Sequence, residues 1–454
     1  MRRKGIPWVI VWAAALTVLV ATVGHAGDPF SSYYHWSGSR LFWFMIISDL
    51  HVGTSGSQDT GYLAWAVGPA RQAVNPAFIV ATGDLTDSTN GGIIPNGPYL
   101  AEWQAYRQIL DAAGMTAGFY YDIPGNHDHY NDESFDYYRV YSIQGSAHGS
   151  TQQGWVKTYA FGTYQFIGTC TAGNDGASFS IWPWDNYGDH AGLDGTELSF
   201  IESQLAAHPE AELTLIFGHH PFHAGYHASS DTGLTYGLSS LLDLIDAYGV
   251  SAYGFGHTHN YRENFYSTNM LDGVFYLNVS SLGKADSDHF AIMAVDGNGL
   301  SVKPGNKGVW PVVLITAPVD RNLGASPQPF AYEVPAGGAN PVRALVFDAG
   351  PLSAVEFRVD AGVWQAMQPV GGGPLWQGFW DASAAAEGVH TIEVRAAGST
   401  TQMDLVNTSV NPALSFGDAD RDGDVDGSDL AALIADYVPS VVKNTAGYFG
   451  KTNF

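Results

Sequence analysis

Residues 123–130 read IPGNHDHY, and this short stretch decides how the chain is interpreted. An apolar, strand-like run, FYYDI at 119–123, stops at Pro124-Gly125, and Asn, His, Asp and His follow at once. Pro, Gly, Asn and Asp are also ordinary turn formers, so a simple turn is the alternative interpretation. The ends of the other predicted strands distinguish between the two.

Four other apolar runs end in the same kind of polar block. They are FWFMIIS (42–48) before Asp49-Leu50-His51, FIVATG (78–83) before Asp84, LTLIFG (213–218) before His219-His220-Pro221, and SAYGFG (251–256) before His257-Thr258-His259. Because the carboxyl ends of strands in an α/β sheet meet in one crevice, we expect these side chains to gather there. Carboxylate, amide oxygen and neutral imidazole favour zinc, manganese or iron.

The order of the predicted elements indicates at least two kinds of architecture. Between about residues 40 and 300, buried strands alternate with helical patterns, which predicts an α/β fold or a layered sandwich. The helices are predicted near 60–74, 99–113, 194–206 and 238–248. From 312 to about 410 only strand patterns appear, separated by closely spaced turn residues, which predicts an all-β sandwich.

Composition limits the possible partners. The chain has 454 residues, 45% of them hydrophobic, and a formal net charge of -25. This length accommodates two or three domains, and the negative charge disfavours duplex nucleic acid as a partner. The single cysteine, Cys170, allows no intramolecular disulfide, and we expect it to be a small buried apolar residue.

The first 26 residues predict export. Arg2, Arg3 and Lys4 precede an almost wholly apolar run at 6–23, and Gly24-His25-Ala26 ends in a small residue. A signal peptide over 1–26 has this layout, so we expect a secreted, periplasmic or cell-surface protein. An uncleaved membrane anchor is the alternative, because the apolar run approaches spanning length.

Taken together, the polar blocks resemble the calcineurin-like metallophosphoesterase superfamily, whose pattern is D-x-H, G-D, G-N-H-[DE], G-H and G-H-x-H. The resemblance covers about 42–300, and it implies a four-layer α/β/β/α sandwich over 27–303 with two metal ions, Mn, Fe or Zn, at the strand ends. The ligands it implies are Asp49, His51 and His259 for one ion, Asn126, His219 and His257 for the other, and Asp84 between them.

The same resemblance implies a mechanism. A hydroxide that bridges the two ions attacks phosphorus in line, and His127 faces the scissile phosphoester, where it stabilises charge or protonates the leaving oxygen. Asp87 occupies the family position that orients this histidine, and Asp128 is the rival for that role. Related Ser/Thr phosphatases have arginine at the position of Ser88, so this chain lacks that phosphate clamp.

An aromatic segment at 178–192 is the candidate for substrate contact. It contains Trp182 and Trp184, which can stack on a base, a sugar or a lipid headgroup. Packing over the sandwich as ordinary loop anchors is the equally weighted alternative.

Two further modules are predicted towards the C-terminus. Residues 310–411 resemble an immunoglobulin-like sandwich, and 416–437 resemble half of a dockerin repeat with an EF-hand calcium loop. The calcium ligands would be Asp418, Asp420, Asp422, Asp424, Asp426 and Asp429. Residues 438–454 carry no matching second loop, so a cohesin partner is doubtful, and attachment to a cell surface or matrix is the expectation.

The sequence as a whole therefore predicts an exported bacterial phosphoesterase with a dinuclear metal centre and a small phosphoester substrate, either a monoester or a diester. One alternative is a phosphodiesterase specific for lipid headgroups or nucleotides. An alternative from another class is a calcium-dependent surface or scaffold protein whose phosphoesterase domain is idle.

Overall fold

The computed structural model describes residues 40–53, 58–90, 97–173, 191–223, 233–268, 271–284, 288–297, 299–323, 326–328, 330–337 and 340–414. Within these ranges, no helix is long and apolar enough to cross a membrane. Three predicted features lie outside the described residues. They are the signal peptide at 1–26, the tryptophans Trp182 and Trp184, and the calcium loop and helix at 416–437.

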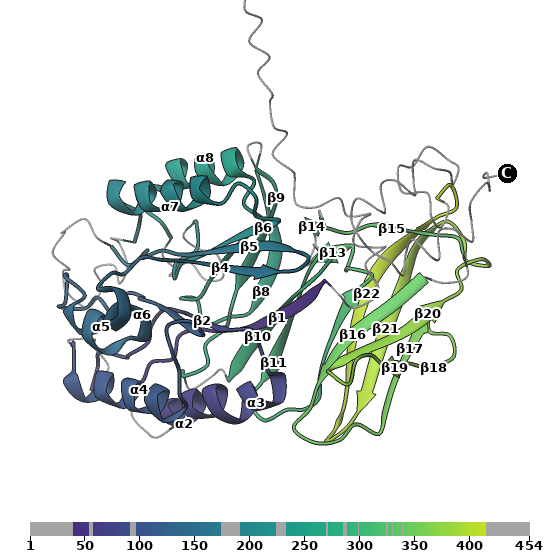
Figure 1. Cartoon of the computed structure of the whole chain (residues 1–454), viewed down its shortest axis with the longest axis horizontal. Coiled ribbons are helices and arrows are strands. Elements are labelled where there is room, and N and C mark those ends of the chain that lie inside the picture. The colour runs from purple at the N-terminus through teal and green to yellow at the C-terminus, as the bar shows by residue number, and fades with distance from the viewer. Residues whose placement is uncertain are drawn as a thin grey trace, which may run out of the picture.

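Two mixed β-sheets form the inner layers of the first part of the chain (Figure 1). The first sheet has the order β11 (Gly299–Asn306), β10 (His289–Asp296), β1 (Leu41–Ile47), β2 (Ile79–Thr82), β3 (Tyr120–Ile123). The second has the order β4 (Gln153–Tyr159), β5 (Gly162–Gly168), β6 (Leu213–Phe217), β7 (Ala252–Phe255), β9 (Leu271–Asn278), β8 (Arg262–Thr268). Neighbouring strands run parallel in β1-β2-β3 and in β5-β6-β7-β9.

Alternation along β1 explains why the sheets stack. Phe44 faces the second sheet, where its ring lies 5.7 Å from Phe166 and 6.3 Å from Phe217. Its neighbours Met45 and Ile47 belong instead to the apolar cluster beneath the helices. A strand that is apolar on both faces must be covered on both sides, and here one cover is a sheet and the other is helical.

Helices cover the outer face of each sheet (Figure 1). On the first sheet they are α2 (Gln58–Trp65), the π-helical η1 (Ala66–Ala70), α3 (Arg71–Val74), α4 (Leu100–Ala112), α5 (Asp136–Tyr141) and α6 (Ile143–His148). On the second they are α7 (Gly195–Ala207) and α8 (Leu238–Tyr248). The layers are therefore α, β, β and α, the α/β architecture that the sequence predicts. Cys170 is fully buried, as expected.

The C-terminal part is β-rich and also contains two sheets. One has the order β12 (Val312–Ala317), β16 (Asn340–Phe347), β20 (Leu375–Trp380), β19 (Gln368–Pro369). The other has the order β15 (Glu333–Pro335), β22 (Thr401–Asn411), β21 (Gly388–Ala397), β17 (Ala354–Val359), β18 (Gln365–Ala366). A two-stranded ribbon, β13 (Asn322–Leu323) with β14 (Ser326–Pro327), forms a separate small sheet. The immunoglobulin-like assignment of this region stays a prediction.

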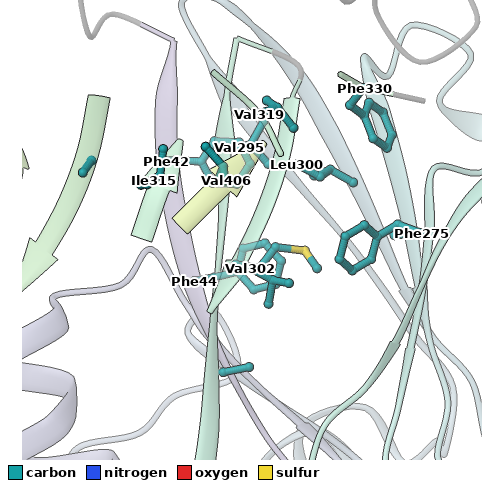
Figure 2. Packing of buried hydrophobic residues seen from close by; sticks show 14 of the residues in the cluster. Phe42, Phe44, Phe275, Val295, Leu300, Val302, Ile315, Val319, Phe330 and Val406 are labelled. Atoms are coloured by element: carbon teal, nitrogen blue, oxygen red, sulfur yellow. The ribbon is translucent and has the colours of Figure 1, made fainter. Parts of the chain in front are cut away.

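The two parts share one apolar core. Ile315 of β12 and Val406 of β22 pack in the same cluster as Phe42 and Val295 of the first sheet (Figure 2). The predicted boundary at 303 cuts through β11, which continues to Asn306. The sequence patterns missed β10 and β11. The pairing of β10 with β1 brings the chain back beside the first strand, and β11 pairs with β10 at the edge of the sheet.

A buried ion pair crosses this contact. Arg343 of β16 lies 2.9 Å from the carboxylate of Asp296 at the end of β10, and both side chains are buried. The Thr316 hydroxyl donates to the other oxygen of Asp296 at 2.6 Å. We call Asp296, Thr316, Arg343 and the apolar residues around them the seam. Separating the two parts would expose their shared apolar core and break this buried ion pair. We therefore expect the two parts to unfold together in one transition rather than as two independent domains.

Candidate metal centre

Five strand ends converge at one edge of the sandwich, where β1, β2 and β3 of the first sheet meet β6 and β7 of the second. The side chains brought together there are the seven predicted ligands, which we call the ligand cluster: Asp49, His51, Asp84, Asn126, His219, His257 and His259. Residues more than two hundred positions apart in the chain are in contact, since His259 Nε2 lies 3.3 Å from Asp49 Oδ1.

The backbone turns sharply at these strand ends. Five cluster residues have left-handed backbone angles, namely Asp49 (φ 50°), His51 (φ 45°), Asp84 (φ 50°), His257 (φ 69°) and His259 (φ 57°). Residues other than glycine rarely adopt this backbone conformation, which costs about 1 kcal/mol at each position. Nearby Gly125 leaves room for this turn, because a Cβ there would lie 2.3 Å from the Asp84 nitrogen.

One half of the cluster is built around His51. Its Nδ1 lies 2.9 Å from Asp87 Oδ1, which fixes the proton of a neutral ring on Nδ1 and leaves a lone pair on Nε2. That lone pair faces His259 Nε2 at 3.2 Å. It also faces Asp84 Oδ2 at 3.6 Å. Burial and the nearby His127 lower the pKa of His51 to about 3, so the ring is neutral at physiological pH.

The other half is built around His219. Its Nδ1 donates to the Thr82 carbonyl at 2.7 Å, so a neutral ring presents the lone pair of Nε2. This atom lies 3.0 Å from Asn126 Oδ1 and 3.3 Å from Asp84 Oδ1. The Asn126 amide nitrogen donates to the Tyr130 hydroxyl, which keeps its oxygen turned into the cluster, 3.1 Å from His257 Nδ1.

In both halves, therefore, electron pairs face electron pairs. Such an arrangement needs a proton or a cation between the atoms, because acceptors alone repel one another. The protein without metal supplies a proton: although burial opposes it, the Asp84 charge raises the pKa of His219 to about 9. The mixture of imidazole nitrogen with carboxylate and amide oxygen fits divalent ions such as manganese, iron or zinc.

His127 sits at the mouth of the ligand cluster, and its side chain is 14% exposed. Its Nδ1 donates to the main-chain carbonyl of Asp87 at 2.6 Å, and its backbone N–H donates to Asp84 Oδ1 at 2.9 Å. Burial lowers the pKa of His127, although the Asp84 charge opposes this. Because Nδ1 is engaged, Nε2 is the atom free to exchange a proton with a substrate.

The predicted role of Asp87 therefore needs correction. Its carboxylate lies 4.0 Å from His127 Nδ1 and is engaged by His51 at 2.9 Å and by Lys284 at 3.1 Å. The turn after β2 instead directs the Asp87 carbonyl at His127, so the main chain orients that ring. The rival, Asp128, accepts the backbone N–H groups of Leu85, Thr86 and Gly125, with no bond to the His127 side chain.

Sequence reasoning missed two residues around the cluster. The Thr171 hydroxyl accepts the backbone N–H groups of His219 and His220, and its position after β5 carries no recognisable signal. Lys284 lies beyond β9 in the sequence Ser-Leu-Gly-Lys (281–284), so it marks a sixth strand end with a polar residue. His220, which has no assigned place among the ligands, is buried with its ring centroid 4.4 Å from that of His257.

A comparison with known families agrees with this geometry. Residues 42–261 match the family described as Calcineurin-like phosphoesterase. The matched stretch contains β1, β2, β3, β6 and β7 and all seven members of the ligand cluster. This part of the chain is thus similar to calcineurin-like phosphoesterases.

Individual proteins resemble the chain more distantly. It is 28% identical over 369 residues to Transmembrane protein 62 of Mus musculus, an alignment that covers 78% of this chain and 53% of the mouse protein. The chain thus spans about half the length of this curated relative. A dimetal phosphatase from Danio rerio is 15% identical with a TM-score of 0.44, covering 59% of this chain and 97% of that one. A purple acid phosphatase from yellow lupin is also 15% identical, with a TM-score of 0.40 and coverages of 60% and 53%.

Proposed function

We propose that the chain is an exported phosphoesterase that uses two divalent or transition metal ions, manganese, iron or zinc, to hydrolyse a small phosphoester. The observation that carries the proposal is the convergence of imidazole, carboxylate and amide lone pairs in the ligand cluster. When bound, two such ions polarise the phosphoryl oxygens and make a water molecule more acidic.

The roles of the ligands follow from which atoms face each other. Asp49, His51 and His259 would hold one ion, and Asn126, His219 and His257 the other. Asp84 would hold both, because its Oδ2 faces His51 and its Oδ1 faces His219. Main-chain and side-chain hydrogen bonds to Asp87, Thr82 and Tyr130 fix the orientation of three ligands before any ion binds.

His127 would act on the substrate itself. With Nδ1 held by the Asp87 carbonyl, its Nε2 is directed to the mouth of the cluster, 3.9 Å from Asp84 Oδ2. From there it would stabilise charge on the phosphoryl group or pass a proton to the leaving oxygen.

The test combines elemental analysis of the purified protein with a panel of chromogenic phosphomonoesters and phosphodiesters. We expect close to two metal equivalents per chain, loss of hydrolysis on exhaustive chelation, and recovery when manganese, iron or zinc is returned. A folded preparation that hydrolyses an ester regardless of chelation would contradict the proposal. A metal-loaded preparation that hydrolyses no ester would favour the alternative of an idle domain in a surface or scaffold protein.

The remaining proposals rest on the sequence. Export depends on the signal peptide at 1–26, and attachment to a cell surface or matrix depends on the calcium loop at 416–437. Amino-terminal sequencing of secreted protein should begin after Ala26, and calcium should raise the melting temperature of the full chain but not of a variant with Asp418 and Asp420 changed to Ala. An intact N-terminus and no calcium effect would refute them.

A further inference from the structure

Lys284 is the cationic residue that the proposed mechanism does not use. Its ammonium nitrogen lies 3.1 Å from Asp87 Oδ1, and the lysine side chain is 32% exposed. Among the residues whose side chains the structure describes, it is the only lysine or arginine within ion-pair distance of a carboxylate at this edge of the sandwich. In a chain with a net charge of -25, such a cation beside the site calls for an explanation.

The turn that carries Lys284 is fixed to the end of β1. The backbone N–H groups of Leu282 and Gly283 donate to the carbonyls of Ser48 and Asp49 at 3.0 and 3.1 Å. The Ser281 hydroxyl donates to the Asp49 carbonyl at 2.9 Å and accepts the Lys284 N–H at 2.8 Å. The backbone at Lys284 is thus positioned by Asp49, whose side chain is one of the predicted metal ligands.

Gly283 shows how closely this turn approaches the site. A Cβ at that position would lie 1.7 Å from the Leu50 carbonyl oxygen, so only glycine fits. The close contact places the lysine beside the segment that joins Asp49 to His51. Because the backbone of Lys284 is already held in place, only the flexible end of its side chain must be ordered when a ligand binds.

The Asp87 carboxylate separates the ammonium group from His127, the residue proposed to face the substrate. Asp87 Oδ1, its partner, is 4.0 Å from His127 Nδ1, and the rings of His51 and His127 are 4.5 Å apart. An ammonium has three N–H donors, and Asp87 is its one side-chain partner among the described residues. Its other donors are therefore not used by the side chains that the structure describes there.

We propose that Lys284 binds a terminal oxygen of the substrate phosphoryl group and makes the enzyme prefer phosphomonoesters to phosphodiesters, an inference that rests on the proposed function. Above the second phosphate pKa of about 6, a monoester carries two negative charges and a diester carries one. The lysine supplies the point charge that the related Ser/Thr phosphatases would obtain from the arginine that Ser88 replaces. Asp87 holds the ammonium in place until substrate arrives.

The experiment compares four metal-loaded proteins: wild type, Lys284→Met, Lys284→Arg and the control Lys307→Met. Lys307 stacks on Tyr62, with its nitrogen 4.4 Å from the ring centroid, and contacts no member of the ligand cluster in the described chain. Each protein is assayed with 4-nitrophenyl phosphate and bis(4-nitrophenyl) phosphate, and inorganic phosphate binding is measured by calorimetry. Metal content is determined for each variant.

We expect Lys284→Met to lower kcat/KM for the monoester by about 10- to 100-fold and to weaken phosphate binding in parallel. The diester should lose less than about threefold, Lys284→Arg should recover most of the loss, and the metal content should not change. An equal loss on both esters, or no loss on either, would overturn the inference.

The two proposals can fail separately. If the wild type hydrolyses neither ester, the proposed function fails, and the phosphate-binding measurement still decides the role of Lys284. If the wild type is active and Lys284→Met binds phosphate as tightly as wild type, the inference alone fails. Metal loss in Lys284→Met would also overturn it, because Lys284 would then act through Asp87 and His51 as a positioning residue.

Discussion

The ligand cluster and the seam bury charge in opposite ways. At the seam, Arg343 meets Asp296 at 2.9 Å, so a cation faces an anion. In the ligand cluster, His219 Nε2 meets Asn126 Oδ1 at 3.0 Å and Asp84 Oδ1 at 3.3 Å, so a neutral imidazole there would face two acceptors. The two charges at the seam neutralise each other within the protein, whereas the cluster needs protons or cations between its acceptors. The first arrangement balances charge inside the fold, and the second offers a cation a set of converging ligands.

The largest expected effect comes from Asp84→Asn. This change removes the carboxylate that faces both halves of the cluster but keeps its shape, so kcat/KM should fall by at least about 10³-fold. Bound metal, measured by elemental analysis, should fall as well. The far-UV circular dichroism spectrum should match wild type, because the seam is untouched. If this variant hydrolysed the ester as fast as wild type, the ligand cluster would not be the catalytic site.

Arg343→Met tests the other side of the comparison. It leaves the Asp296 carboxylate buried without its cation, which should lower the free energy of unfolding by about 3–5 kcal/mol in a denaturant titration. Metal content and kcat/KM of the folded fraction should be unchanged. The double variant Arg343→Met with Asp296→Asn should recover part of the loss; equal instability of the single and double variants would show that the ion pair is not responsible.

His127→Gln separates the substrate-facing residue from the ligands. Glutamine keeps a polar side chain but cannot exchange a proton, so kcat should fall by about 10²-fold while metal content stays at the wild-type value. Loss of metal together with activity would instead place His127 among the ligands.

Asp87→Asn sharpens the corrected assignment. Because the His127 ring is held by the Asp87 main chain, the substitution should leave kcat of the metal-saturated enzyme within about threefold of wild type. It should weaken metal affinity by about 10- to 100-fold, since His51 loses its carboxylate partner. A competition titration with a fluorescent chelator measures this. A large fall in kcat at saturating metal would restore the carboxylate as the group that orients His127.

The smallest effect concerns a buried carboxyl away from both regions. Burial raises the pKa of Glu197 on α7 from 4.5 to about 7. The folded protein therefore holds this proton more tightly than the unfolded chain, so the stability it contributes is present below pH 4.5 and is lost as the pH rises through about 7. In wild type, the free energy of unfolding should fall by about 1–3 kcal/mol from this group between pH 4.5 and 7, and Glu197→Gln should remove that fall. Unfolding titrations at several pH values measure it. Glu202→Gln on the exposed face of the same helix should keep it.

The local signals were strongest where strands end in polar residues. The runs before Asp49, Asp84 and Asn126 correspond to β1, β2 and β3 with bounds that differ by at most one residue. The apolar helix periodicity likewise located α4, α7 and α8. β10 escaped notice because its partner, β1, lies more than two hundred residues away in the sequence, a distance over which no local pattern operates. β11, which pairs with β10, was missed with it.

The sequence by itself determined which residues could bind metal, because residue type and spacing at strand ends are local properties. The tertiary structure alone decided which atom of each residue faces the cluster, that the Asp87 carbonyl rather than its carboxylate orients His127, and that Lys284 joins the site. It also decided that the β-rich part shares a core with the first sheet. Hydrogen-bond direction, left-handed turns and buried charge pairing arise only when distant segments pack, so they leave no mark on a single stretch of sequence.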